Sequence, residues 1–371
     1  MIYLAGFAVT YVLVLVLAAK LPARDDRYVL RRCDGGVAFR PQRLLFVGLF
    51  LLCSLPLFLI SALREGIGTD YYFTYTPRFL EILQGERTYY EIGFYYFNRL
   101  VGAFTSNPQW IFVTTSAVYM LFVFLAFYEN TDELPFCVLL LLASGEYLIS
   151  LNNLRQAMAA SVLLFGYRFL RREQWVRFGL LTILCATIHQ SMLVFLPVLV
   201  LIVAMKYIRL ERLLPWLTIG VLAAWLLFQS DSAILRMFLP ERLLYYIEYA
   251  IYNEPTIGKA RILVNVVLFV FLLLARRLSK DKELDIFVLI QFLAVALCLF
   301  DAMLPATYRI LRLFTFWQLL GLPIAVGRFS RRTGTKTVLQ IALLGLLGAL
   351  NVYSIVYLGT EEVLPYHSIF H

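Results

Sequence analysis

The sequence has 371 residues, of which 61% are hydrophobic and only 15% are charged. A soluble globular domain is nearer half apolar and a quarter charged, so this composition excludes an ordinary soluble enzyme and indicates a membrane protein. The formal net charge is +9. Its basic residues lie in short clusters between apolar segments, as cytoplasmic loops of membrane proteins do, and we therefore expect no nucleic-acid partner.

The cysteines and histidines do not form the pattern of a metal centre or a disulfide framework. Five cysteines are scattered without a CxxC pair, and two of the three histidines lie near the C-terminal end. We therefore expect no metal and no other cofactor. The first apolar segment, 2–19, has no basic region before it and no small-residue cleavage site after it, which favours a retained helix over a signal peptide.

Apolar segments that approach the roughly 20 residues needed to cross a bilayer recur along the whole chain. They predict an all-α polytopic membrane protein with about twelve transmembrane helices in a single domain, 1–371. Residues 91–105 are too short and too polar to span, and predict a re-entrant or half-buried helix packed against protein. The predicted spans are 2–19, 43–62, 108–128, 134–151, 156–171, 176–190, 191–205, 213–229, 260–275, 284–301, 306–327 and 337–357.

The distribution of Lys and Arg predicts the orientation in the membrane. With the N-terminus outside, 22 of the 33 basic residues fall in the cytoplasmic loops. The acidic sequence ENTDEL is the weakest part of this assignment, although acidic residues have little influence on topology. Both termini and two long loops, 63–107 and 230–259, are then expected outside the cytoplasm. The predicted cytoplasmic loops are 20–43, 129–134, 168–177, 206–212, 276–282 and 328–336.

The basic residues outside these loops are ten arginines and one lysine. A guanidinium binds phosphate or carboxylate through a planar two-pronged contact, so an outward cavity lined by arginines would suit a lipid-linked diphosphate. Arg309 and Arg312, one turn apart, are placed to share a phosphate. In the alternative interpretation the arginines reach lipid headgroups or pair with acidic residues such as Glu91. The set is Arg64, Arg78, Arg87, Arg99, Arg155, Arg236, Arg242, Arg261, Arg309, Arg312 and Lys259.

Two polar motifs lie in the first outward loop. REGIGTDYYFTY begins at Arg64 and contains Asp70 and Tyr71. Asp70 is a candidate to orient an arginine, to act as a base or to pair within the loop. YEIGFYYFN begins at Tyr90, and its Glu91 either caps the helix that follows or meets sugar hydroxyls.

Two further motifs lie at the outward ends of later spans. NNLRQA places Asn152, Arg155 and Gln156 between two apolar segments, where so dense a polar group favours function over a simple turn. His189 is the only histidine within the predicted bundle. A neutral imidazole can accept the proton of an attacking hydroxyl near neutral pH, whereas the alternative is a buried histidine bonded to a backbone carbonyl.

In these motifs the sequence resembles the EpsG family of Wzy-like polysaccharide polymerases. The resemblance implies a bundle like that of the C-type glycosyltransferases in the inner (cytoplasmic) membrane of a bacterium. It also implies metal-independent joining, on the extracytoplasmic face, of undecaprenyl-diphosphate-linked oligosaccharide repeat units into exopolysaccharide, capsule or O-antigen. Expected partners are this lipid-linked oligosaccharide, the lipid bilayer, and a flippase and chain-length regulator of the same pathway. The matching segments are 64–75, 90–98, 154–159, 189–191 and 364–366.

The resemblance also implies roles for individual residues. His189, or failing that Asp70, would accept the proton of the acceptor hydroxyl. Arg155 would stabilise the charge that develops on the diphosphate leaving group. The residues expected to bind the diphosphate or the sugars are Arg64, Gln156, Arg309, Arg312, Glu91, Tyr71, Asn152 and Arg236.

Two other functions are compatible with the sequence. A glycosyltransferase that adds single sugars from a polyprenyl-phosphate donor would use an acidic base in the first outward loop, where Asp70 lies. A flippase or transporter of lipid-linked glycans would show inverted repeats and polar residues near the membrane midplane. The sequence has no clear internal repeat, and its polar motifs lie towards one face, so the transporter ranks third.

Overall fold

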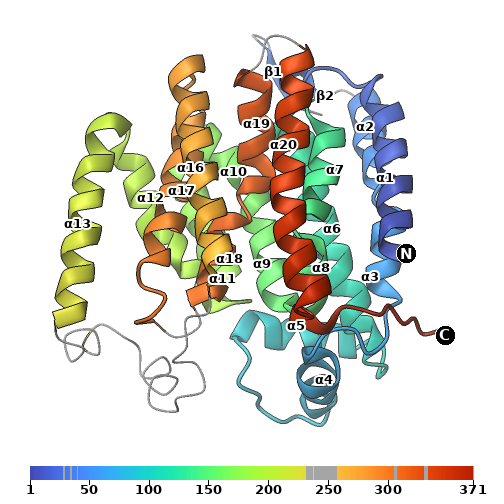
Figure 1. Ribbon diagram of the computed structural model, residues 1–371. Helices are drawn as coiled ribbons and strands as arrows, with labels where there is room; N and C mark the ends of the chain where they lie inside the picture. The colour runs from blue at the N-terminus through green and yellow to red at the C-terminus, as the bar shows by residue number, and fades with distance from the viewer. Residues whose placement is uncertain are drawn as a thin grey trace. The chain divides into compact units, whose positions relative to one another are not determined.

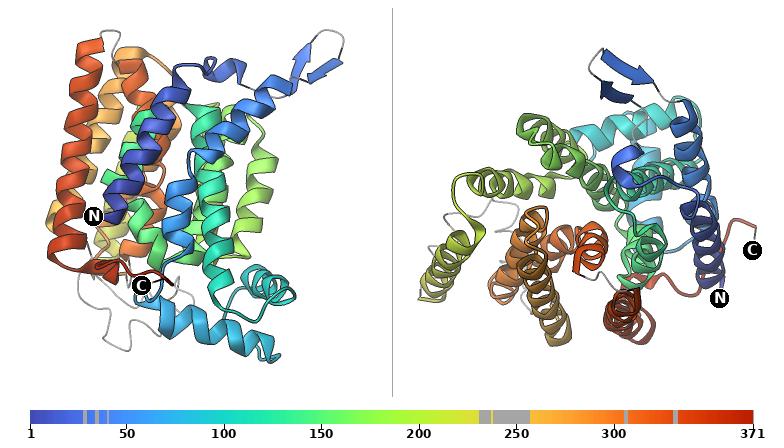
Figure 2. Two further views of the ribbon diagram at one scale, coloured as in Figure 1. Left: turned by 90° about the vertical axis from the view of Figure 1, so that its right-hand side faces the viewer. Right: turned by 90° about the horizontal axis from the view of Figure 1, so that it is seen from above.

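The computed structural model describes residues 1–27, 30–33, 36–39, 41–230, 237, 257–304, 307–329 and 333–370. The described chain is almost entirely helical, apart from an antiparallel hairpin of β1 (Leu30–Cys33) and β2 (Gly36–Phe39), which projects beyond helix α2 (Figure 2). The chain packs as two compact units, and each is described separately. Unit 1 comprises Met1–Phe195 and Ser330–His371, and unit 2 comprises Leu196–Phe329.

Unit 1 contains the helices before residue 195 and the last helices of the chain (Figure 1). Short helices at 71–75, 92–102 and 360–362 lie among the long ones, at positions where the sequence turns polar. In chain order the helices are α1 (Ile2–Ala18), η1 (Arg24–Asp26), α2 (Pro41–Leu52), α3 (Leu55–Ala62), η2 (Tyr71–Tyr75), α4 (Thr76–Leu83), α5 (Ile92–Gly102), α6 (Gln109–Asn130), α7 (Leu134–Ala143), α8 (Glu146–Asn152), α9 (Leu154–Phe165), α10 (Tyr167–Arg171), α11 (Trp175–Ala186), η3 (Gln190–Val194), α20 (Thr333–Asn351), η4 (Val352–Tyr357) and η5 (Thr360–Glu362).

Helix α6 is the centre of unit 1. It packs against α9, α3 and α2, whereas α1 packs against α3 and α7, and α20 packs against α7. Phe124 and Phe127 of α6 are fully buried. Lipid is as apolar as these side chains, so close packing between helices, more than the hydrophobic effect, holds such a bundle together.

Unit 2 is built mainly around α16 and α17. Helix α16 packs against α17 and α19, and α17 also contacts α13 and α18. Three buried amide side chains, Asn265, Gln291 and Gln318, hydrogen-bond one another and join α16, α17 and α19. The helices are α12 (Phe195–Ala204), whose first residue belongs to unit 1, α13 (Leu210–Ser230), α16 (Lys259–Ser279), α17 (Leu284–Cys298), α18 (Thr307–Thr315) and α19 (Gln318–Phe329).

The predicted number of twelve membrane spans is not confirmed. Five described helices are long and apolar enough to cross a membrane, or seven if each of two bent helix pairs is one span. Helices occupy all twelve predicted ranges, but several are short or broken. Between α7 and α8 the axis bends by 54° at Gly145, whose φ is +74°. A run of apolar residues predicts a buried helix. It does not predict a bend within that helix, such as the one at Gly145, because the bend depends on how neighbouring segments pack.

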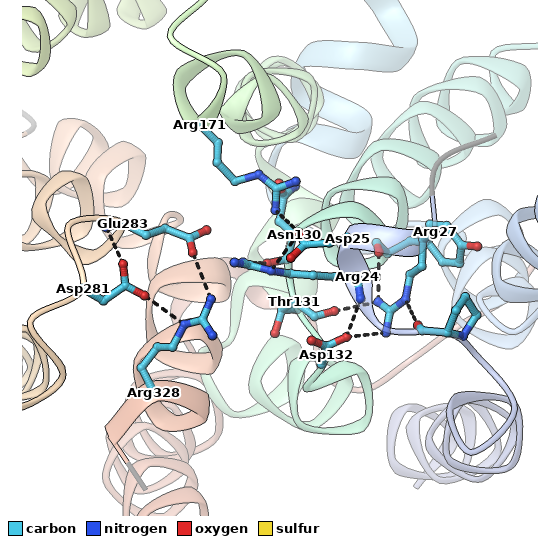
Figure 3. A network of polar contacts seen from close by, with 12 residues as sticks. Arg24, Asp25, Arg27, Asn130, Thr131, Asp132, Arg171, Asp281, Glu283 and Arg328 are labelled. Atoms are coloured by element: carbon cyan, nitrogen blue, oxygen red, sulfur yellow. Dashed lines mark hydrogen bonds and ion pairs between the residues drawn. The ribbon is translucent and has the colours of Figure 1, made fainter. Parts of the chain in front are cut away.

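The predicted cytoplasmic loops of unit 1 meet at one end of the unit (Figure 3). Arg27 Nη1 donates to the carbonyls of Tyr128 and Thr131, at 3.0 and 2.7 Å, and Nη2 pairs with Asp132 at 2.8 Å. Arg24 Nη1 donates to the carbonyl of Asn130 at 2.9 Å. The last carbonyls of a helix lack partners within it, so the two arginines cap the C-terminal end of α6. Burial lowers the pKa of Arg27, and Asp132 opposes that shift.

The acidic loop at 129–134 neutralises basic loops around it. Glu129 pairs with Arg168 at 3.1 Å, and Glu133 pairs with Lys336 at 2.5 Å. The negative charge that made this loop exceptional in the sequence is therefore explained by its neighbours. The loops grouped by charge do share one end of unit 1, although which end faces the cytoplasm stays a prediction. In unit 2, Arg328 likewise pairs with Asp281 and Glu283 (Figure 3).

Replacing Arg27 with alanine should lower the free energy of unfolding by about 2 kcal/mol, because buried carbonyls at the end of α6 lose a charged donor. The measurement is the midpoint of thermal unfolding in detergent. Arg177→Ala is the control, since Arg177 is an exposed arginine of α11. Equal shifts of the two midpoints would show that Arg27 does not have this capping role.

Candidate functional site

Four segments of unit 1 meet at the end opposite the β1–β2 hairpin (Figure 1). They are the start of α5, the junction of α8 and α9, the junction of α11 and η3, and the chain after η4. We call the place where three of these segments meet the junction site and define it by Glu91, Arg155 and His189. Glu91 contacts the Arg155 side chain and the backbone directly after His189. The contacts of Glu91 with Arg155 and with the backbone of Gln190 lie within unit 1.

Arg155 and Glu91 form a partly buried ion pair in the junction site. Arg155 Nη1 lies 2.6 Å from Glu91 Oε2, and the two side chains are 15% and 13% exposed. Aromatic rings surround the guanidinium, with the ring centres of Tyr90 and Phe94 at 4.6 and 5.9 Å. Rings and a carboxylate together compensate a cation that has little water around it. For Arg155, the structure thus shows the acidic pairing that the sequence offered as the alternative interpretation.

The second oxygen of Glu91 reaches a third segment. Oε1 accepts a hydrogen bond from the backbone N–H of Gln190 at 3.3 Å, next to His189. Beside it, the N–H of Gly93 donates to the carbonyl of Thr187 at 2.7 Å. A Cβ at residue 93 would lie 2.2 Å from Thr187 Oγ1, so only glycine permits this close approach. Glu91 makes no side-chain cap of α5 and joins segments instead.

His189 lies in the junction between α11 and η3. Its backbone is extended, with φ −149° and ψ 111°, and its side chain is half-buried. Nδ1 lies 2.6 Å from Ser191 Oγ. In the tautomer with the proton on Nδ1, the ring donates to Ser191 and Nε2 is the basic nitrogen. The hydrogen bond between Glu91 and Gln190 fixes the backbone directly after His189.

Asn152 connects the loop that carries Asp70 to the end of α8. Its Oδ1 accepts hydrogen bonds from Thr69 Oγ1 and from the Asp70 N–H, both at 3.1 Å. Its Nδ2 donates to Glu361 Oε2 at 2.8 Å. Asp70 Oδ1 in turn accepts a bond from Thr74 at 3.0 Å. Asn152 thus serves as a connector here, and Glu361 is a member of this region that sequence reasoning missed.

Arg64 and Tyr71 lie in the protein interior, which gives their predicted contact with substrate no support. Arg64 is 0% exposed, and Nη2 donates to the carbonyl of Leu151 at 3.1 Å. Burial lowers the pKa of Arg64 to about 10, so it remains a cation at neutral pH. Tyr71 stacks on Phe112 with ring centres 4.1 Å apart and donates to Gln109 at 2.6 Å. Both residues hold the loop in place, a role that a linear motif does not distinguish from binding.

The other predicted binding residues are distributed over the chain. Gln156 is 7% exposed and directly follows Arg155 in α9. In unit 2, Arg309 is exposed whereas Arg312 is buried, and the phosphate contact shared by this pair stays a prediction. Arg312 instead lies over the ring of Tyr308 at 4.2 Å, with Arg261 at 5.5 Å from the same ring. Arg236 lies outside the described residues.

The junction site combines a cation, a carboxylate and an imidazole. Such a set suits the binding of an anionic group beside a hydroxyl that must lose its proton. Among the residues that the structure describes, no group of three or more His, Cys, Asp or Glu side chains is arranged to hold a metal ion.

The ion pair should couple the effects of substitution at its two positions. In the double variant of Glu91→Ala and Arg155→Ala, we expect a loss of stability smaller than the sum of the single losses by about 1–3 kcal/mol, because each single change strands a buried charge. The measurement is thermal unfolding of the four proteins in detergent. The control is the pair Arg78–Glu81, whose side chains are 36% and 29% exposed and whose changes should add. Additive losses at Glu91 and Arg155 would contradict the coupling.

Comparison with known proteins gives one family match. The model of the EpsG family matches residues 47–368, which is most of the chain. No curated protein and no solved structure matches the sequence. The matched range includes all three residues of the junction site, and it extends from the second predicted span to the segment after η5. The chain therefore belongs to the EpsG family.

Proposed function

We propose that this protein is a polysaccharide polymerase that joins undecaprenyl-diphosphate-linked oligosaccharide repeat units on the extracytoplasmic face of the bacterial inner membrane. The family and the apolar helices support a membrane protein of exopolysaccharide synthesis. The observation that carries the finer proposal is the geometry of the junction site. There, Glu91 pairs with the guanidinium of Arg155 and also accepts the N–H of Gln190, the residue after His189. Exopolysaccharide, capsule and O-antigen are the candidate products.

In the proposed reaction, a sugar hydroxyl of one repeat unit attacks the anomeric carbon of another. A new glycosidic C–O bond forms, the bond from that carbon to the lipid diphosphate breaks, and the electron pair leaves with the diphosphate. His189 Nε2 accepts the proton of the attacking hydroxyl. Arg155 stabilises the charge on the leaving diphosphate, which is the point where a preorganised cation accelerates the step most. The reaction needs no metal in this scheme.

Glu91 gives the proposed site a resting state. Without substrate, its carboxylate neutralises Arg155 at 2.6 Å. A diphosphate offers the guanidinium the same kind of oxygen with more negative charge, so it can compete with Glu91 for Arg155. The carboxylate is then available to accept hydrogen bonds from sugar hydroxyls. This exchange avoids leaving a buried cation without a partner in either state.

The proposal also covers the topology of the chain, a phosphate contact in unit 2 and the partner proteins. Both termini are expected outside the cytoplasm, and the chain is expected to act as one membrane domain. Arg261 and Arg312 concentrate positive charge around Tyr308 in unit 2, which supports keeping Arg312 as a candidate for phosphate contact. A flippase that delivers the repeat unit and a regulator of chain length would be the partners in such a pathway.

Purified protein in detergent, given its lipid-linked repeat unit without added metal, should produce a ladder spaced by whole repeat units on a gel. Arg155→Ala and His189→Ala should each lower the rate at least about a hundredfold, since each removes a charge or proton acceptor from the transition state. Arg177→Ala is the control, because Arg177 is an exposed arginine at the start of α11, at the other end of that helix from the His189 segment. A ladder that both variants produce at the normal rate would refute the assigned roles.

A single-sugar glycosyltransferase is the second candidate, because Asp70 is held close to the junction of α8 and α9 by Asn152. The two functions differ in the base. Asp70→Asn should leave polymerisation within about tenfold of normal, because it keeps the shape of the side chain and spares His189. The same assay measures it, beside His189→Ala. Loss of activity in Asp70→Asn with full activity in His189→Ala would favour the single-sugar transferase.

A further inference from the structure

The segment after η4 forms a strap along the loop that carries Asp70. We define the strap as residues 359–370, which leave the end of α20 that lies opposite the hairpin (Figure 1). Its backbone pairs with the first outward loop: the Gly68 N–H donates to the carbonyl of Glu362 at 3.0 Å, and the Glu65 N–H donates to that of His367 at 3.1 Å. Near its end, the Ile369 N–H donates to the carbonyl of Leu63 at 3.0 Å.

The strap contains two consecutive residues in an unusual backbone conformation. Glu361 has φ +75° and Glu362 has φ +48°, in the left-handed region that glycine usually occupies. Each such residue costs on the order of 1 kcal/mol and persists where the surrounding contacts hold it in place. The turn therefore needs compensating interactions, and the side chain of Glu361 makes them.

The carboxylate of Glu361 accepts hydrogen bonds from two adjacent asparagines. Oε2 lies 2.8 Å from Asn152 Nδ2 and 3.4 Å from Asn153 Nδ2. These are the two residues at the break between α8 and α9. Because an amide side chain can rotate by half a turn, a carboxylate that takes up the Nδ2 group of Asn152 also determines where its Oδ1 points.

From these two asparagines, contacts extend to the loop that carries Asp70 and to the first turn of α9, which carries Arg155. With its Nδ2 held by Glu361, Asn152 turns its Oδ1 towards the loop and accepts the N–H of Asp70 at 3.1 Å. Asn153 is the N-cap of α9, and its carbonyl accepts the N–H of Ala157 at 2.9 Å. Arg155 is the second residue of that helix. One carboxylate thus orients the loop of Asp70 and the first turn that carries Arg155.

We infer that Glu361 is a positioning residue for the junction site. It acts through Asn152 and Asn153 and sets where the Arg155 guanidinium lies relative to a bound diphosphate. This inference rests on the proposed function for its effect on catalysis, but its structural part, the control of the Asp70 loop, does not. Nothing in the sequence pattern marks Glu361, because its importance comes from a contact between residues 209 positions apart.

The catalytic test compares Glu361→Ala, Glu361→Gln and Glu362→Ala in the full chain, with the lipid-linked repeat unit as substrate. Glu361→Ala should lower kcat about ten- to a hundredfold, because Asn152 and Asn153 lose their hydrogen bonds to a charged acceptor and Arg155 loses its position. KM should stay within about threefold of normal. Glu361→Gln keeps an acceptor oxygen and should recover most of kcat. Glu362→Ala is the matched control, because Glu362 shares the left-handed backbone but contributes its carbonyl to the contact with Gly68.

The structural test is hydrogen exchange at the backbone amide of Asp70, which needs no substrate. The exchange rate should rise in Glu361→Ala, since Asn152 loses its orientation, and stay near normal in Glu361→Gln and Glu362→Ala. Faster exchange in Glu361→Ala together with no polymer from the wild type would refute the proposed function and support the positioning role. If Glu361→Ala matches Glu362→Ala in both kcat and exchange, or if Glu361→Gln is as impaired as Glu361→Ala, the inference is overturned.

Discussion

The ion pair between Arg155 and Glu91 determines how the candidate site can be built. A guanidinium with 15% of its side chain exposed needs a partner, and the partner comes from a residue 64 positions away on a short helix outside the main bundle. To bring Glu91 within 2.6 Å, the start of α5 must press against Thr187, which only a glycine at residue 93 allows. The position of α5, and with it the aromatic rings around Arg155, follows from compensation of one charge.

The two ends of unit 1 solve the same electrostatic problem in different ways. At the hairpin end, Arg24 and Arg27 donate mainly to the carbonyls that end α6, so the arginines complete a helix and stabilise the fold. At the junction end, Arg155 meets a carboxylate and rings. Backbone carbonyls cannot be displaced without unfolding the helix end, whereas a carboxylate partner can be exchanged for another anion. Arg155 therefore differs from Arg24 and Arg27 in having no backbone carbonyl among the partners described here.

Much of the helical fold could be predicted from the sequence, because apolar runs and loop charges report on the bilayer directly. Helices occupy every range where a span was expected, and the loops grouped by their charge do meet in unit 1. The breaks could not be predicted. At the bend, Asn351 Nδ2 donates to the carbonyl of Ala143 at 2.9 Å, and its Oδ1 would lie 2.5 Å from a Cβ added at Gly145. Composition does not report such contacts between distant segments.

For the candidate site, the sequence located the motifs better than the roles within them. The polar residues at 152–156 and 189–191 do border the junction site, because polar groups at the ends of apolar spans are costly without a purpose. Arg64 was grouped with Arg155 although it is wholly buried and bonded to backbone. Both arginines lie in polar motifs next to apolar spans, and what distinguishes them is the burial and the partners of each guanidinium in the structure. Glu361 carried no signal at all, since its partners lie in another part of the chain.

The strap also imposes an order on the assembly of this protein. The loop around Asp70 is synthesised early, directly after the second predicted span, but two of its N–H groups bond to the strap, which is synthesised after all the predicted spans. Until then, the loop lacks these backbone partners and Asn152 lacks its carboxylate. A partly inserted chain would therefore present the lipid substrate with an incomplete site. Residue 361 must therefore be synthesised before the contacts that join the strap to Asn152 and to the loop of Asp70 can form.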